Sequence, residues 1–259
     1  MAVIRNARVK HPASFGTLAH TVSRLSNAQK TSKGAPAYSR FVNRRAGRYL
    51  AACAYHLRMT PNAVTGISGL WSLAGIILIA VGHPSIAVGV AVMLCLAIGY
   101  AFDSADGQLA RLRGGGSPAG EWLDHVVDAA KISALHLAVL VSFYRFGSNA
   151  AELLVPVGWT FVGPVLFFVI ILNDQVRRAH GTAPAVDASA PVLRSLLVAP
   201  TDYGVLLLSF VLFGWHTAFV WVYGLLLLGN IAYLVLGLAK WFRELRALPA
   251  NRSADRIAE

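Results

Sequence analysis

Four closely spaced aspartates are the first feature of this chain that could carry chemistry. The 259 residues include only 12 Asp and Glu against 23 Lys and Arg, and no acidic residue precedes Asp103. Asp103 and Asp106 are three residues apart, and Asp124 and Asp128 are four apart. On a helix each pair would lie on one face. Two unit charges about 4 Å apart interact by roughly 4 kcal/mol at an effective dielectric near 20, so we expect cations or protons among these carboxylates.

Carboxylate oxygens are typical ligands of hard divalent cations such as Mg²⁺, Mn²⁺ and Ca²⁺. Two such ions can hold the attacking and leaving oxygens of a phosphoryl displacement. Small residues beside the aspartates would let a bulky ligand approach the helices, although helix packing explains each of them singly. Arg111 follows Asp106 by five residues and could reach a phosphate. The pattern therefore indicates phosphate chemistry at a divalent metal site.

The elements that must position these residues are membrane helices. The composition is 56% hydrophobic and 14% charged, and the mean hydropathy is +0.57, which excludes a disordered chain and is typical of a polytopic membrane protein. We predict an all-α fold with six transmembrane helices, preceded by a basic amphipathic helix at the membrane interface. The six apolar segments are 62–82, 84–110, 119–144, 151–175, 200–215 and 217–240. The short glycine-rich stretch 113–118 should fold the second and third into an antiparallel pair.

The chain divides into four predicted parts. Residues 1–35 read as a disordered basic cytoplasmic tail, with a mitochondrial targeting peptide as the alternative. Residues 36–59 form the amphipathic interfacial helix, with a soluble core-facing helix as the alternative. Residues 60–241 form the six-helix catalytic domain, and residues 242–259 form a second cytoplasmic tail.

Basic residues flank the predicted spans almost entirely on one side. With a cytoplasmic N-terminus and an even number of spans, most Lys and Arg fall on the cytoplasmic face, as the positive-inside rule requires. The aspartates then lie near that face. A nucleic-acid binder, suggested only by the net charge of +11, is excluded because the basic residues flank apolar spans. A divalent cation transporter is the other class considered, but its site would lie near the bilayer midplane.

The string Asp-x2-Asp-Gly-x2-Ala-Arg-x8-Gly-x3-Asp-x3-Asp over residues 103–128 resembles the signature of the CDP-alcohol phosphotransferases. These are integral membrane enzymes of phospholipid biosynthesis. All eight defining positions match, and they are Asp103, Asp106, Gly107, Ala110, Arg111, Gly120, Asp124 and Asp128.

The resemblance implies a transferase that moves a substituted phosphate from a CDP-alcohol to an acceptor hydroxyl and releases CMP. It implies that Asp103, Asp106 and Asp124 bind Mg²⁺ or Mn²⁺, with two ions expected, and that Asp128 both binds metal and accepts the hydroxyl proton. At least one substrate would be a lipid, and the protein would be a homodimer. The implied CDP-binding residues are Gly107, Ala110, Arg111 and Gly120, with Asn62 and Thr65 from a Pro-Asn-x-(Ile/Val)-Thr stretch that equally suits a simple helix start.

Substrate choice is less constrained. Gly120-Glu121-Trp122-Leu123-Asp124-His125 resembles the choline- and ethanolamine-phosphotransferases, whereas bacterial phosphatidyl-transferring members more often have Ser at position 125 and Arg directly after the fourth aspartate. An aminoalcohol-type donor is therefore an alternative to CDP-diacylglycerol. Lys131, Arg177 and Arg194 are candidates for acceptor binding. Lys131 could instead pair with the aspartates, and the two arginines could be topological signals only.

Overall fold

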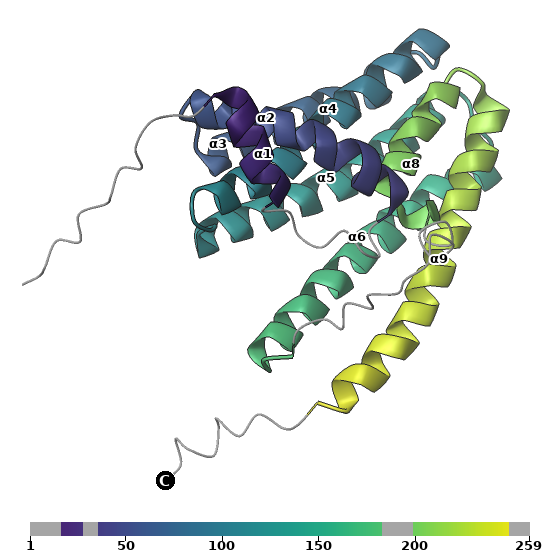
Figure 1. The fold of residues 1–259 in the computed structure, drawn as a ribbon. Helices are drawn as coiled ribbons and strands as arrows, with labels where there is room; N and C mark the ends of the chain where they lie inside the picture. The colour runs from purple at the N-terminus through teal and green to yellow at the C-terminus, as the bar shows by residue number, and fades with distance from the viewer. Residues whose placement is uncertain (1–16, 28–35, 183–198, 249–259) are drawn as a thin grey trace, which may run out of the picture.

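The computed structural model describes residues 17–27, 36–182 and 199–248, and the elements in these ranges are all helical (Figure 1). This confirms the all-α fold predicted from the sequence. The elements are α1 (Leu18–Asn27), η1 (Ser39–Asn43), α2 (Arg44–His56), α3 (Pro61–Val81), α4 (Ile86–Leu112), α5 (Pro118–Arg145), α6 (Ala150–Ala179), η2 (Ala199–Thr201), α8 (Tyr203–Ser209), η3 (Phe210–Leu212) and α9 (His216–Arg246).

Side-chain caps set the start of the helices that carry the aspartates. The Ser85 hydroxyl accepts the Val88 N–H at the start of α4, and the Ser117 hydroxyl accepts the Gly120 N–H at the start of α5. These bonds satisfy amides that have no partner within the helix. Between the two helices, Gly114 and Gly115 have φ values of 99° and 127°. Glycine adopts this conformation readily, so the short connection that the sequence predicts is formed here.

α3 lies against both α4 and α5, which contact it far more extensively than they contact each other. A short loop joins α4 to α5, but they are not the directly packed pair that this loop suggested. Small residues allow the close approach of α3 and α4: a Cβ atom on Gly99 would lie 2.4 Å from Ser72 Oγ. Such residues are typical of helix contacts in membranes. The aspartates of the motif lie on α4 and α5, near the loop that joins these two helices.

Five described helices are long and apolar enough to cross a membrane, namely α3, α4, α5, α6 and α9. The predicted span 200–215 is instead a shorter apolar segment, Tyr203–Leu212, below the roughly 20 residues that a straight spanning helix needs. It nevertheless extends along α4, because Tyr203 packs edge-on against Tyr100 and Phe210 lies beside Gly89. Six crossings thus remain a prediction, and the five long helices make the chain an integral membrane protein.

Two elements differ from the predicted tails. Residues 18–27 lie in the segment expected to be disordered, yet they form α1, whose Leu25 is 2% exposed against α2. Leu18, Val22 and Leu25 have the spacing of an apolar helix face, which explains this. At the other end, α9 continues to Arg246 rather than stopping at residue 241. The rest of both predicted tails lies outside the described residues.

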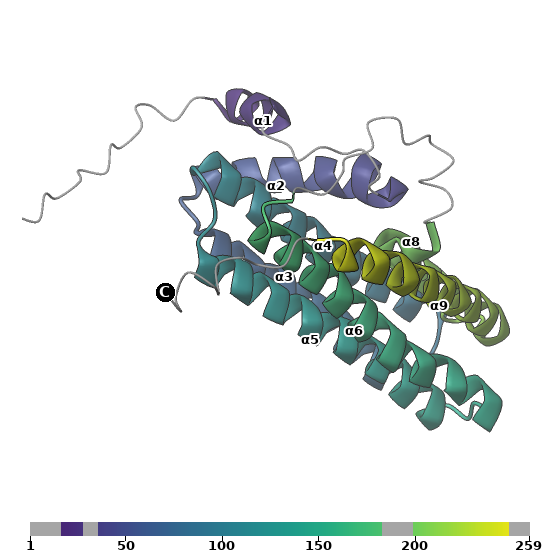
Figure 2. The same cartoon turned by 90° about the horizontal axis from the view of Figure 1, so that it is seen from below.

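α2 lies along one side of the long helices, between them and α1 (Figure 2). Its buried face is made of small residues against α4. Several side chains of the apolar face predicted for residues 36–59 remain exposed, namely Phe41, Val42, Tyr49, Cys53 and Leu57. An interfacial helix requires exposed apolar side chains on a helix that also carries arginines. We therefore keep the interpretation of residues 36–59 as an interfacial helix.

Asp202 joins the segment before α2 to the start of α8. It is 1% exposed; its Oδ1 accepts the Gly204 N–H at 3.0 Å and its Oδ2 accepts the Tyr38 N–H at 2.8 Å. The sequence suggested only a first-turn role for this residue. The Tyr38 ring then stacks on Tyr100, with centroids 6.3 Å apart. One buried carboxylate therefore fixes two elements that are far apart in the chain.

Replacing Gly204 with alanine is expected to destabilise this junction. The new Cβ would lie 2.0 Å from Tyr38 Cγ, so the Tyr38 ring must move. Overpacking of this kind costs about 1–3 kcal/mol, and thermal unfolding in detergent should show a lower midpoint. Gly66→Ala is the matched control, because nothing lies within 4 Å of its added Cβ. Equal midpoints for the two variants would show that Tyr38 does not pack on Gly204.

Candidate active site

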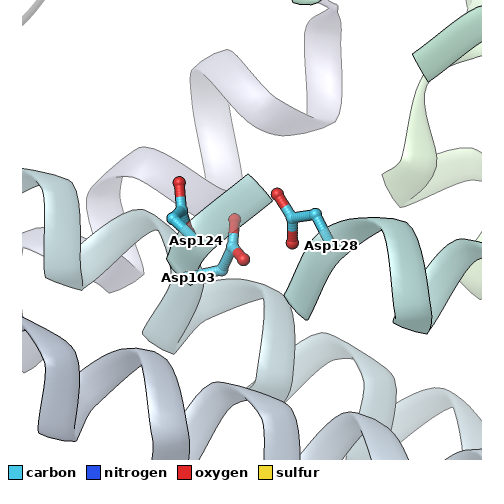
Figure 3. Close-up of side chains that lie close together, drawn as sticks. All are labelled: Asp103, Asp124 and Asp128. Atoms are coloured by element: carbon cyan, nitrogen blue, oxygen red, sulfur yellow. The ribbon is translucent and has the colours of Figure 1, made fainter. Parts of the chain in front are cut away.

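Three of the four predicted aspartates meet in the space between α4 and α5. One carboxylate oxygen each of Asp103, Asp124 and Asp128 lies within 4.8 Å of the others. In Figure 3 the Asp103 carboxylate, from α4, lies between those of Asp124 and Asp128, from α5. All three side chains are partly exposed. Three of the aspartates whose spacing in the sequence indicated a common site therefore lie close together, although they come from two different helices.

The Lys131 ammonium group partly neutralises this cluster. Its Nζ lies 2.6 Å from Asp103 Oδ1 and 2.8 Å from Asp128 Oδ1. It also donates to Ser68 Oγ of α3 at 3.1 Å, and Ser68 in turn donates to the Gly99 carbonyl at 2.8 Å. Of the two roles considered for Lys131, pairing with the carboxylates is the one seen here. One cation cannot balance several carboxylates, so the cluster retains a negative charge.

Asp106 occupies a different position from the other three aspartates. It is 5% exposed, and its Oδ2 accepts a hydrogen bond from the Thr65 hydroxyl at 2.6 Å. Thr65 was expected to hold the nucleotide. Its contact is instead with Asp106, so it orients a carboxylate of the motif. Metal ligation by Asp106 remains a prediction.

A cavity of about 300 Å³ opens beside the aspartates. It is the expected place for a nucleotide, because Gly107 and Arg111 of the motif lie on its wall. A Cβ atom on Gly107 would lie 3.4 Å from an Arg111 guanidinium nitrogen, so these two motif residues are neighbours in the cavity wall. The lining residues are Ser39, Asn43, Arg44, Tyr100, Asp103, Ser104, Asp106, Gly107, Gln108, Arg111 and Asp124.

A second cavity of about 160 Å³ contacts the same cluster. Asp103 and Tyr100 line both cavities and therefore form a shared wall between them. Asp128 and Lys131 line only the second. Its complete lining is Ser72, Tyr100, Asp103, Asp128, Lys131, Ile132, Phe167 and Tyr203.

Other predicted nucleotide-binding residues lie at the edge of this region. The Asn62 side chain is beside Gly120, whose added Cβ would lie 3.1 Å from Asn62 Oδ1. Neither Asn62 nor Gly120 lines either of the two cavities described above. The N-terminal cap of α3 is Thr60, whose side chain accepts the Ala63 N–H. Ala110 lies close to Gly116 of the connecting loop. The roles of Asn62, Gly120 and Ala110 toward the nucleotide therefore remain predictions.

The arginines considered for acceptor binding are not placed at the second cavity. Arg177 forms an ion pair with Glu244 and so joins α6 to α9. Its neighbour Arg178 pairs with Glu121 at 2.8 Å and with Asp174 at 2.5 Å. Arg194 lies outside the described residues. In the described ranges, the cation at the second cavity is Lys131.

The donor set fits a hard divalent cation. Three carboxylates within reach of one point, with oxygen atoms only, are the ligands that Mg²⁺ and Mn²⁺ prefer. The negative charge that Lys131 leaves unbalanced would attract such a divalent cation. Asp103, Asp124 and Asp128 are therefore the residues that would hold metal here.

Several cavity residues were not recognised in the sequence. Tyr100 precedes Asp103 by three residues on the same helix face, and this spacing could have indicated it. Tyr203 gives no such signal, because it comes from α8, far along the chain. The same is true of residues 39–44, which read only as part of an amphipathic helix. Their placement depends on tertiary contacts.

Comparison with known proteins identifies a family and a similar fold. The family model described as CDP-alcohol phosphatidyltransferase matches residues 58–236. Two structures of the Mycobacterium tuberculosis phosphatidylinositol phosphate synthase are similar in fold. The one with CDP-DAG bound has a TM-score of 0.53 and 20% identity, covering 80% of this chain and 96% of the other. The one with manganese and citrate has a TM-score of 0.52 and 23% identity, covering 78% and 89%.

No curated protein sequence matches the chain. The family match extends over most of its length and contains α3, α4, α5 and α6, including every aspartate of the motif. The chain therefore belongs to the CDP-alcohol phosphatidyltransferase family.

Proposed function

We propose that this protein transfers a phosphatidyl group from CDP-diacylglycerol to the hydroxyl of an acceptor and releases CMP. The observation that carries the proposal is the carboxylate cluster of Asp103, Asp124 and Asp128, which lies between two cavities. A donor diphosphate in one cavity and an acceptor hydroxyl in the other would meet at these side chains. The fold similarity to a synthase solved with CDP-DAG bound supports this donor.

The larger cavity is the proposed donor site. Arg111 lines it and would bind the diphosphate, and Gly107 lies beside the Arg111 guanidinium. Asp103 and Asp124, with Asp106, would hold two divalent ions, which when bound would neutralise the diphosphate and the departing CMP. Thr65 would keep the Asp106 carboxylate oriented through its 2.6 Å hydrogen bond.

The smaller cavity is the proposed acceptor site. Asp128 lines it and would take the proton from the acceptor hydroxyl. The oxygen of that hydroxyl then forms a bond to the phosphorus that carries the diacylglycerol. The bond from this phosphorus to the oxygen of CMP breaks, and CMP leaves with that oxygen. Lys131, held 2.8 Å from Asp128, would stabilise negative charge during the transfer.

An aminoalcohol-type donor remains the second candidate, because Glu121 and His125 match that branch in sequence. Their contacts give it little support. The Glu121 carboxylate binds Arg178 at 2.8 Å and lies 3.9 Å from His125 Nε2. Neither residue lines the two cavities. Glu121 thus joins α5 to α6 through Arg178, which supports the proposal that these two residues do not select the donor.

We further propose that the aspartates face the cytoplasm and that the protein acts as a homodimer. The first proposal is supported by the basic residues that flank the spans at the same end as the site, such as Arg113, Arg178 and Arg243. The homodimer is supported only by the family assignment.

The test is CMP release by purified protein with Mg²⁺, offered CDP-diacylglycerol, CDP-choline or CDP-ethanolamine with several hydroxyl acceptors. We expect labelled CMP from CDP-diacylglycerol only when a hydroxyl acceptor is present. CMP release from CDP-choline or CDP-ethanolamine with diacylglycerol, and none from CDP-diacylglycerol, would establish the aminoalcohol reaction instead.

A further inference from the structure

The segment before the first spanning helix forms part of the larger cavity. Ser39, Asn43 and Arg44, from η1 and the first turn of α2, line it together with the motif residues. These three residues precede residue 58, where the family match begins. The cavity therefore has a wall that belongs to neither α4 nor α5.

Close contacts hold this wall against the aspartate helix. A Cβ atom on Gly47 would lie 2.7 Å from Ser104 Oγ, so glycine is needed for α2 to approach α4 at the motif. The Gln108 side chain donates to the Arg44 carbonyl at 3.2 Å. At the other end of the segment, Asp202 holds the Tyr38 N–H. Backbone and small-residue contacts thus hold residues 39–44 in this position beside the cavity.

Two polar groups at the cavity lack partners within the described residues. Asn43 is 3% exposed, and its Oδ1 accepts no hydrogen bond there. Arg111 Nε, on the facing helix, is also buried without an acceptor. A buried polar group without a partner costs free energy, so such groups in a cavity wall indicate a polar ligand.

The charges at the cavity indicate what that ligand is. Arg44 and Arg111 line the same space as Asp103, Asp106 and Asp124. Once the carboxylates bind divalent ions, the two arginines would give this cavity a positive charge that an anionic ligand would balance. Guanidinium groups bind phosphate oxygens through paired hydrogen bonds.

We propose that residues 43 and 44 are donor-binding residues: the Arg44 guanidinium binds the diphosphate of the CDP-linked donor, and the Asn43 amide hydrogen-bonds the same nucleotide. This inference rests on the proposed function. The segment before the first spanning helix would then contribute directly to the nucleotide site, besides lying at the membrane.

The test measures binding of CDP in the presence of Mn²⁺ by calorimetry, with the protein in nanodiscs of neutral phosphatidylcholine. Neutral lipid excludes an effect of Arg44 on anionic headgroups. Arg44→Gln is expected to weaken CDP binding roughly ten- to a hundredfold, as for the loss of a hydrogen bond to a charged group. It should also raise KM for CDP-diacylglycerol more than it lowers kcat.

Arg45→Gln is the matched control, because Arg45 is the next residue, is exposed and does not line the cavity. It should bind CDP as the wild type does. Arg44→Lys should give an intermediate affinity, since lysine keeps the charge but not the paired hydrogen bonds. Asn43→Ala, which removes no hydrogen bond made by Oδ1 in the described structure, should weaken CDP binding severalfold.

The outcomes separate this inference from the proposed function. If the wild type binds CDP and releases CMP while the Arg44 and Asn43 variants match Arg45→Gln, the donor-binding role is wrong and the enzyme activity stands. If the wild type neither binds CDP nor releases CMP, both are overturned. Unchanged unfolding midpoints for the variants would show that the loss lies in binding.

Discussion

Asp128→Asn is expected to abolish CMP release while the protein remains folded. Asparagine has nearly the same shape but cannot accept the proton of the acceptor hydroxyl. Loss of a general base costs about 10²–10⁴-fold in rate, and the weakened metal site adds to this. Lys131 retains its 2.6 Å contact with Asp103, so the local packing should persist. The measurement is the rate of labelled CMP release, followed with the unfolding midpoint.

Asp174→Asn is the matched control for this variant. Asp174 is also a helical aspartate in an ion pair, with Arg178 at 2.5 Å, but it lines neither cavity. Its activity should equal that of the wild type. Mn²⁺ binding by Asp128→Asn distinguishes the role of Asp128 as general base from its role as metal ligand. If only the general base is lost, the remaining carboxylates of the variant should still bind Mn²⁺. Turnover of Asp128→Asn within tenfold of the wild type would remove Asp128 from the mechanism.

Chelation of divalent ions is expected to reduce CMP release to background, and Mg²⁺ or Mn²⁺ should restore it. Asp103, Asp124 and Asp128 present oxygens within 4.8 Å of one another, and Lys131 balances only part of their charge. A donor diphosphate would add further negative charge at the same place. Without divalent ions the repulsion between donor and protein should prevent productive binding.

Mn²⁺ titration followed by electron paramagnetic resonance supplies a readout that is independent of turnover. With CDP present we expect saturation at two ions per chain, whereas Asp103→Asn should bind fewer ions or bind them more weakly. Added Mg²⁺ should not restore the activity of that variant. CMP release that continues at full rate after complete chelation would refute the role of the metal.

The sequence was most informative where function restricts local spacing. The helical spacing and the short glycine-containing loop predict that all four aspartates of the motif meet. Asp103, Asp124 and Asp128 do so, whereas Asp106 lies outside this group and binds Thr65. The long apolar helices were predicted for a similar reason, since each must cover the hydrocarbon thickness by itself.

Other features depend on contacts between distant parts of the chain, which the sequence does not reveal. The separation of α4 and α5 by α3 is one example, because a short loop by itself favours direct packing. The Arg177–Glu244 ion pair is another, since Glu244 lies on α9, far from Arg177 in the sequence. Asn43 and Arg44 reach the cavity only because Gly47 admits close packing on Ser104.

The lengths of α4 and α5 also determine how the reaction responds to the membrane. At 27 and 28 residues they extend about 40 Å, which exceeds the roughly 30 Å hydrocarbon layer. The aspartates, about two to three turns from the ends joined by the glycine loop, would then lie where acyl chains give way to headgroups. A lipid donor would arrive by lateral diffusion, so turnover should follow its mole fraction in the bilayer and fall on dilution with inert lipid at constant bulk concentration.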